Sequence, residues 1–118
     1  MGSLYKHVRS SYQKVPAIGT VMFRSSEKTY SGYLVNICKE GLMLKARELP
    51  DPDEEITLSF QLLHSNHLYH LKAFVLWVSP NRNPNFLNEM GARFVDLGSE
   101  DRRHINQHID KFYTPQLF

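Results

Sequence analysis

The segment "EITLSFQLL", residues 55–63, carries the clearest secondary-structure signal in the chain. Apolar and polar side chains alternate along it, with Ile56, Leu58, Phe60 and Leu62 on one side and Thr57, Ser59 and Gln61 on the other. A period of two residues is typical of a β-strand that has one face in a core and the other toward solvent. The segment therefore predicts a β-rich fold with an apolar interior.

Five further segments on either side of this strand are rich in β-branched, aromatic or other apolar residues: 17–24, 29–37, 41–46, 68–78 and 89–97. The sequences between them, such as "SSEK", "HSNH" and "SPNRNPN", contain residues that favour turns. Short strands with hairpin-like connections are typical of a small antiparallel barrel, whereas a parallel sheet needs helices between its strands. We expect a core that includes Ile56, Leu58, Phe60, Val75, Trp77 and Phe94.

The end of the chain has a helical period. After a candidate N-cap at Ser99, the apolar residues Ile105, Ile109 and Phe112 recur at i, i+4 and i+7. This spacing predicts a helix over residues 99–113 with all three apolar side chains packed on the sheet. The predicted fold class is all-β, a six-stranded antiparallel barrel with one C-terminal α-helix. We divide the chain into a basic arm (1–16), a barrel with its closing helix (17–113) and a tail (114–118).

The composition limits the classes of partner. Among 118 residues, 14 Lys and Arg stand against 12 Asp and Glu, and the formal charge of +2 does not indicate binding to DNA or RNA. The longest wholly apolar run, residues 73–78, is far too short for insertion into a membrane. The single cysteine, Cys38, has no intrachain partner for a disulfide, as expected in a reducing cytosol. We expect one soluble, cytoplasmic domain.

Patterns for catalysis and metal binding are weak. No serine stands in a G-x-S-x-G motif, and no glycine-rich phosphate loop is present. His64, His67 and His70 are spaced by three residues and His104 and His108 by four, but neither set has an evident further ligand. We therefore expect no enzymatic activity, no catalytic residue, no cofactor and no metal.

A basic arm and one turn remain as candidates for a ligand site. The arm is "VRSSYQKVP", residues 8–16, and the turn is "NICKEG", residues 36–41, which places Asn36, Cys38 and Gly41 at the end of a strand. One interpretation is structural, with Gly41 supplying a positive φ in a hairpin and Asn36 bonding to nearby backbone. The other interpretation is that the same residues bind a ligand.

In their order along the chain, these features resemble the PilZ domain family. Members of this family are bacterial modules that bind cyclic di-GMP through an arm written R-x-x-x-R and a strand-end motif written [D/N]-x-S-x-x-G. The likeness extends over nearly the whole chain, through the tryptophan-bearing strand "FVLWV", the strand "GARFVDL" and the closing helix. The resemblance implies a barrel that acts as a receptor without catalysis.

The R-x-x-x-R motif of the family can be aligned with the arm in two ways. Either Arg9 occupies the first arginine position and Gln13 the second, or Ser10 occupies the first and Lys14 the second. Arginine donates two parallel hydrogen bonds to a phosphate or a guanine edge, whereas lysine is a point charge and glutamine is uncharged. In either alignment at least one arginine position of the arm is filled by another residue, which predicts weaker binding of the dinucleotide.

In the turn, the resemblance implies that Asn36, Cys38 and Gly41 meet a guanine edge. Asn36 is an allowed residue of the motif, Cys38 replaces the serine and Gly41 is retained. An amide offers one neutral acceptor where a carboxylate would accept charge-assisted bonds, and a thiol is a weaker donor than a hydroxyl. This motif too predicts reduced affinity.

The sequence thus predicts a signalling module that binds cyclic di-GMP weakly through Arg9, Gln13 or Lys14 and the turn. The alternative is an adaptor that has lost nucleotide binding and works through a protein partner of unknown identity. Such an interface would use exposed aromatic side chains, for which the candidates are Tyr30, Tyr33, Phe86, Tyr113 and Phe118.

Overall fold

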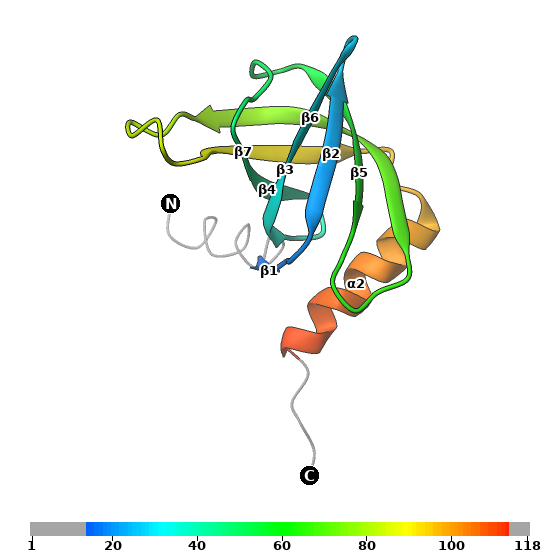
Figure 1. The fold of residues 1–118 in the computed structure, drawn as a ribbon. Helices are drawn as coiled ribbons and strands as arrows, with labels where there is room; N and C mark the ends of the chain where they lie inside the picture. Colours follow the sequence, from blue (N-terminus) through cyan, green and yellow to red (C-terminus); the bar gives the residue numbers. More distant parts are fainter. Residues whose placement is uncertain (1–13, 114–118) are drawn as a thin grey trace, which may run out of the picture.

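In the part of the chain that the structure describes, six antiparallel strands close into a β-barrel, with one short extra strand and one helix (Figure 1). The computed structural model describes residues 14–113. The strands are β1 (Val15–Pro16), β2 (Thr20–Ser25), β3 (Lys28–Ile37), β4 (Gly41–Ala46), β5 (Glu55–Gln61), β6 (Leu68–Ser79) and β7 (Asn88–Val95), and the helix is α2 (Ser99–Tyr113). Their order is β1-β3-β2-β5-β6-β7-β4, and a pairing of β3 with β4 closes the barrel. The predicted fold class is confirmed.

The strand that the opening segment predicts is β5, at the centre of an uninterrupted part of the barrel. Ile56, Leu58 and Phe60 are at most 3% exposed and form the core together with residues from β2 and β6. Phe60 stacks on Tyr69 of β6 with ring centroids 4.5 Å apart. Val75 is also fully buried, as predicted. The period-two pattern therefore identified the core face of β5 correctly.

The prediction that Trp77 belongs to the core is wrong. β6 pairs in regular register with β7 as far as Val75, and the register then shifts before Trp77. The extra residue, Leu76, reverses the alternation, so Trp77 points outward and is 38% exposed. Phe94, another predicted core residue, is half-buried and packs against the core from its border.

The helix α2 has the predicted bounds and covers one end of the barrel (Figure 1). Ile105 and Ile109 are buried, as the helical spacing predicts. Phe112 is 49% exposed, which contradicts its predicted packing, because the last turn of α2 extends past the strands (Figure 1). Gly98, and not Ser99, is the N-cap, since its carbonyl accepts the first helical bond from the N–H of Arg102.

His67 and His104 form contacts that hold the beginning of α2 against the barrel. His67, just before β6, lies with Nε2 2.7 Å from Oδ1 of Asp101, and its ring stacks on His104 with centroids 3.9 Å apart. Tyr69 also contacts the ring of His67 edge-on, with centroids 4.5 Å apart. Within residues 14–113, no helix has the length and apolar character needed to span a membrane.

Candidate functional site

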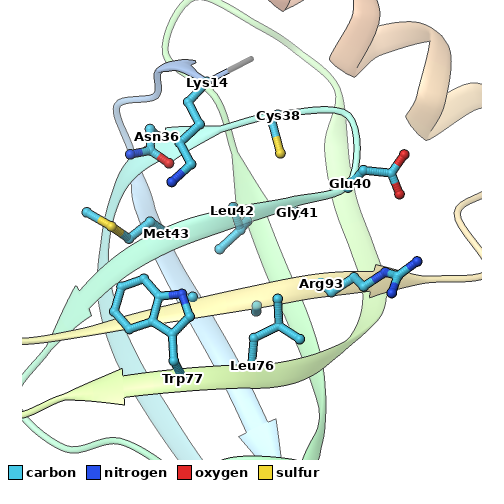
Figure 2. Close-up of a pocket in the computed structure, with 12 residues that line it drawn as sticks. Lys14, Asn36, Cys38, Glu40, Gly41, Leu42, Met43, Leu76, Trp77 and Arg93 are labelled. Atoms are coloured by element: carbon cyan, nitrogen blue, oxygen red, sulfur yellow. The ribbon is translucent and has the colours of Figure 1, made fainter. Parts of the chain in front are cut away.

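A pocket of about 330 Å³ opens beside the turn between β3 and β4 (Figure 2). Its polar lining comes from Lys14, Asn36, Cys38, Glu40 and Arg93. Its apolar lining includes Leu42, Met43, Leu76 and Trp77. The volume lies at the lower end of the range of about 300–1,000 Å³ that is usual for small-molecule sites.

The turn at residues 38–40 forms one wall of the pocket and is tied to two strands. The N–H of Cys38 donates to the carbonyl of Gly41 at 2.8 Å, and the N–H of Phe94 on β7 donates to the carbonyl of Glu40 at 2.8 Å. Cys38 is buried, at 7% exposure, and its sulfur points toward the pocket in Figure 2. The turn is therefore held in place by the barrel itself.

Gly41 is required by a close approach between strands. A Cβ atom at this position would collide with the carbonyl oxygen of Ala92 on β7. The interpretation in which Gly41 supplies a positive φ is wrong, because Gly19 is the only glycine with positive φ in the described part of the chain. The glycine serves packing of β4 on β7, which brings the turn next to Arg93.

The pairing of β1 with β3 brings Lys14 to the pocket. Val15 is buried and pairs with Ile37, so the preceding side chain, that of Lys14, points outward. Asn36 pairs with Pro16 on one side and with Met43 on the other, directly after a register shift in β3. In Figure 2 the Lys14 amine and the Asn36 amide lie close together at the pocket.

Trp77 lies at the pocket because of the register shift in β6. Its indole covers Gly91 of β7, where a Cβ atom would collide with the indole nitrogen. The sequence predicted a core position for Trp77 and so did not indicate it as a site residue. Gly91 was the available signal, since a glycine inside a strand often indicates a bulge or a close approach.

Two charged residues at the other end of the pocket were also missed. Glu40 lies in the turn at residues 38–40, and Arg93 on β7 pairs with Gly41 on β4. In Figure 2 both side chains lie at the end away from Met43. Together with Lys14 they give the pocket one more positive than negative charge. Arg93 could not be assigned from sequence, because the pairing of β4 with β7 joins strands that are not consecutive.

The pocket unites four residues that the sequence indicated: Lys14, Asn36, Cys38 and Gly41. Arg9, Gln13 and Phe118 lie outside the described residues, as does the side chain of Tyr113. Among residues 14–113 no histidine lines the pocket: His67 and His104 stack on each other, His70 bonds to Ser59 at 2.8 Å and His108 bonds to the carbonyl oxygen of Pro16. Over residues 14–113, no group of three or more His, Cys, Asp or Glu side chains could hold a metal ion.

Comparison with protein families gives a match over most of the chain. The PilZ domain model matches residues 6–111. No match was found among curated protein sequences.

Solved structures match the same fold. The inhibitor of motility MotI/DgrA of Bacillus subtilis superposes with a TM-score of 0.71 at 14% identity, covering 89% of this chain and 52% of that one. YcgR of Escherichia coli, solved in complex with c-di-GMP, gives 0.69 at 13% identity, covering 86% and 45%. PlzA of Borreliella burgdorferi, also in complex with c-di-GMP, gives 0.62 at 14% identity, covering 99% and 59%. The chain thus spans about half the length of these proteins, and the likeness concerns the fold.

Proposed function

The chain belongs to the PilZ domain family, and we propose that it is a non-enzymatic bacterial signalling module that binds cyclic di-GMP weakly. The observation that carries this proposal is the pocket. Two separate segments that the family motifs single out line one cavity of about 330 Å³, with Lys14 from the arm and Asn36, Cys38 and Gly41 from the turn. Family members of the same fold, YcgR and PlzA, were solved with this ligand.

The polar residues of the pocket suit the two kinds of group in the ligand. Lys14 supplies a charge for a phosphate, while Asn36 and the thiol of Cys38 offer hydrogen bonds to a guanine edge. Arg93 adds a guanidinium at the other end, where it would compensate in part for the arginine position that the arm fills with another residue. Glu40 beside it opposes a phosphate and contributes to weak binding.

The apolar residues suit a base. Trp77 presents an exposed indole over Gly91, and stacking of a base on an aromatic ring is worth about 1–3 kcal/mol. Met43 and Leu76 flank the indole. A volume at the low end of the usual range fits one nucleoside half of the dinucleotide, with the other half on the open surface beside it.

The replaced motif residues set the expected strength. Each charge-assisted hydrogen bond that is lost costs roughly 1.5–3 kcal/mol. Two such losses, one in the arm and one at Asn36, weaken binding by about two to four decades relative to intact motifs. The module would then respond only to high ligand concentrations.

Titration with cyclic di-GMP tests the proposal directly. Trp77 is the only tryptophan in the sequence, so its fluorescence reports binding at this pocket, and calorimetry gives the affinity. We expect a change in fluorescence, weaker binding as salt rises from low to physiological, and less binding of cyclic di-AMP, whose bases lack the guanine edge. Two variants restore the arm in its two alignments, Gln13→Arg alone and Ser10→Arg together with Lys14→Arg. Absence of binding at near-millimolar ligand in the wild type and in both of these variants would overturn the proposal.

The second candidate is an adaptor that acts through a protein partner. Tyr33 and Phe86 are 58% and 62% exposed, which suits such a surface, whereas Tyr30 is half-buried and stacks on Phe23 at 5.1 Å. Aromatic side chains are enriched in protein interfaces. This candidate becomes the better one if neither the wild type nor the restored arms bind the nucleotide.

A further inference from the structure

One hydrogen bond joins the C-terminal helix to the start of the described chain. Nε2 of His108, on α2, lies 2.9 Å from the carbonyl oxygen of Pro16, on β1, across 92 positions of sequence. A carbonyl oxygen can only accept, so the imidazole donates from Nε2. The ring of Phe112 packs against His108 with centroids 5.3 Å apart and restricts its rotation. The donor is therefore held toward β1.

The strand β1 has few contacts of its own. It contains two residues, and β3 is the one strand that it pairs with in the described sheet. Val15 is buried, and the N–H of Ala17 donates to the carbonyl of Val35 at 3.1 Å. Because backbone groups of successive residues point to opposite sides of a strand, residues 15 and 17 face β3 and the Pro16 carbonyl faces away. His108 bonds to β1 at this edge, on the side away from β3.

The same strand positions two components of the pocket. Lys14 directly precedes β1, and Asn36 pairs with Pro16 across β1 and β3. A shift of Pro16 would therefore move the Lys14 backbone and remove the neighbour that flanks Asn36. His108 itself does not line the pocket.

We propose that His108 is a positioning residue for the ligand site: through Pro16 it fixes β1 and thereby holds Lys14 over the pocket. This inference rests on the proposed function and adds a regulatory consequence to it. Coupling between two sites is reciprocal, so a ligand that holds Lys14 in place also strengthens the docking of α2. Occupancy of the pocket is then transmitted through β1 to α2.

Three variants separate the hydrogen bond from other effects. His108→Phe keeps a ring beside Phe112 and removes the donor. His108→Gln removes the ring and keeps an N–H donor on a side chain of similar reach. Gln107→Ala alters the exposed neighbour on α2 and serves as the control for helix propensity.

The first readout needs no ligand. Amide exchange of Ala17, measured by NMR in the ligand-free protein, should accelerate about three- to tenfold in His108→Phe, the size expected for one lost hydrogen bond. Amides of β5 should keep their wild-type rates. His108→Gln and Gln107→Ala should resemble the wild type. Unchanged exchange of Ala17 in His108→Phe would overturn the proposal, as would equal acceleration of Ala17 and β5 amides in both His108 variants.

The second readout is the affinity for cyclic di-GMP, followed by Trp77 fluorescence. His108→Phe should weaken binding by about three- to tenfold, with His108→Gln restoring it. Equal affinity in His108→Phe and wild type would contradict the proposal. If neither the wild type nor the variants with a restored arm bind the nucleotide, the proposed function fails, while exchange at Ala17 still decides whether His108 positions β1.

Discussion

The two sides of the barrel differ in regularity. On one side, residues 21–24, 55–61 and 68–74 pair across β2, β5 and β6 without a break. On the other side, β3 shifts register between Leu34 and Asn36, and β6 shifts between Val75 and Trp77. We call the first the regular wall and the second, which includes β3, β4, β7 and the end of β6, the bulged face.

The pocket lies on the bulged face, next to both shifts. Asn36 and Trp77 are the first paired residues after the register changes in β3 and β6, and both line the cavity. A bulge inserts one residue, turns the following side chain to the other face and bends the strand. The comparison indicates that the regular wall provides stability, whereas the irregularities of the bulged face place polar and aromatic groups at the surface.

The largest effect should come from the regular wall. Phe60→Ala removes a ring that is 3% exposed and stacked on Tyr69, and we expect a loss of about 3–5 kcal/mol in the free energy of unfolding. Denaturant titration measures it, with the exposed neighbour Gln61→Ala as the control. A loss below about 1 kcal/mol would break the distinction between the two sides.

The arm should affect binding and leave stability unchanged. Arg9→Ala should weaken cyclic di-GMP binding by about 1.5–3 kcal/mol, because a charge-assisted contact to phosphate is lost. In the opposite direction, either Gln13→Arg or the pair Ser10→Arg and Lys14→Arg should tighten binding, and the set that does so identifies the arm alignment. Cys38→Ser in each background should add a stronger donor at the turn. Calorimetry at fixed salt gives all affinities, and equal affinities throughout would exclude the arm from the site.

On the bulged face, Trp77→Ala should separate binding from stability. Loss of the stacking platform should weaken cyclic di-GMP binding by about 1–3 kcal/mol. Because the side chain is 38% exposed, the loss in unfolding free energy should stay below about 2 kcal/mol. Calorimetry replaces fluorescence here, since the variant has no tryptophan. A loss of stability as large as that of Phe60→Ala, with binding unchanged, would make Trp77 a structural residue.

The regular wall could be predicted from the sequence and the bulged face only in part. Where strands pair without a break, strict alternation at Ile56, Leu58 and Phe60 identifies the core face. The same rule fails at Trp77, because local sequence does not determine on which residue of β6 the bulge falls. Local sequence also does not indicate that Arg93 lies beside Gly41, since the two become neighbours only through the pairing of β4 with β7.

The sequence did identify four of the pocket residues, through family motifs and not through the alternation of apolar and polar side chains. Lys14, Asn36, Cys38 and Gly41 stood out through their order and spacing, which a family resemblance can recognise without any knowledge of the pairing. The function of the glycine was misjudged, because a positive φ and a close interstrand contact both require glycine and look alike in sequence. The exposed position of Phe112 depends on where the barrel ends, which the helical period does not indicate.

The smallest expected effect concerns pH and the helix at the regular wall. Partial burial, together with the nearby His67 and Arg103, lowers the pKa of His104 below its ordinary value of 6.5. The unfolded chain therefore binds a proton at His104 more readily than the folded chain, so stability rises with pH and is lost as pH falls through about 6.5 and below. Burial is the largest cause, and the contact with His67, whose ring stacks on that of His104 with centroids 3.9 Å apart, adds to it.

Melting temperatures across this pH range test the assignment. The wild type should melt at lower temperature as pH falls, and His104→Gln, which cannot be protonated, should show a flatter dependence. Trp77→Ala should keep the wild-type slope, because the substitution changes no charged or titratable group and lies about 30 Å farther along β6 than the start of that strand, which adjoins His67. Equal slopes in His104→Gln and wild type would remove His104 as the cause. A flattened slope in Trp77→Ala, which removes no titratable group, would show that the two sides of the barrel are coupled through their packing and would break the comparison from which these predictions start.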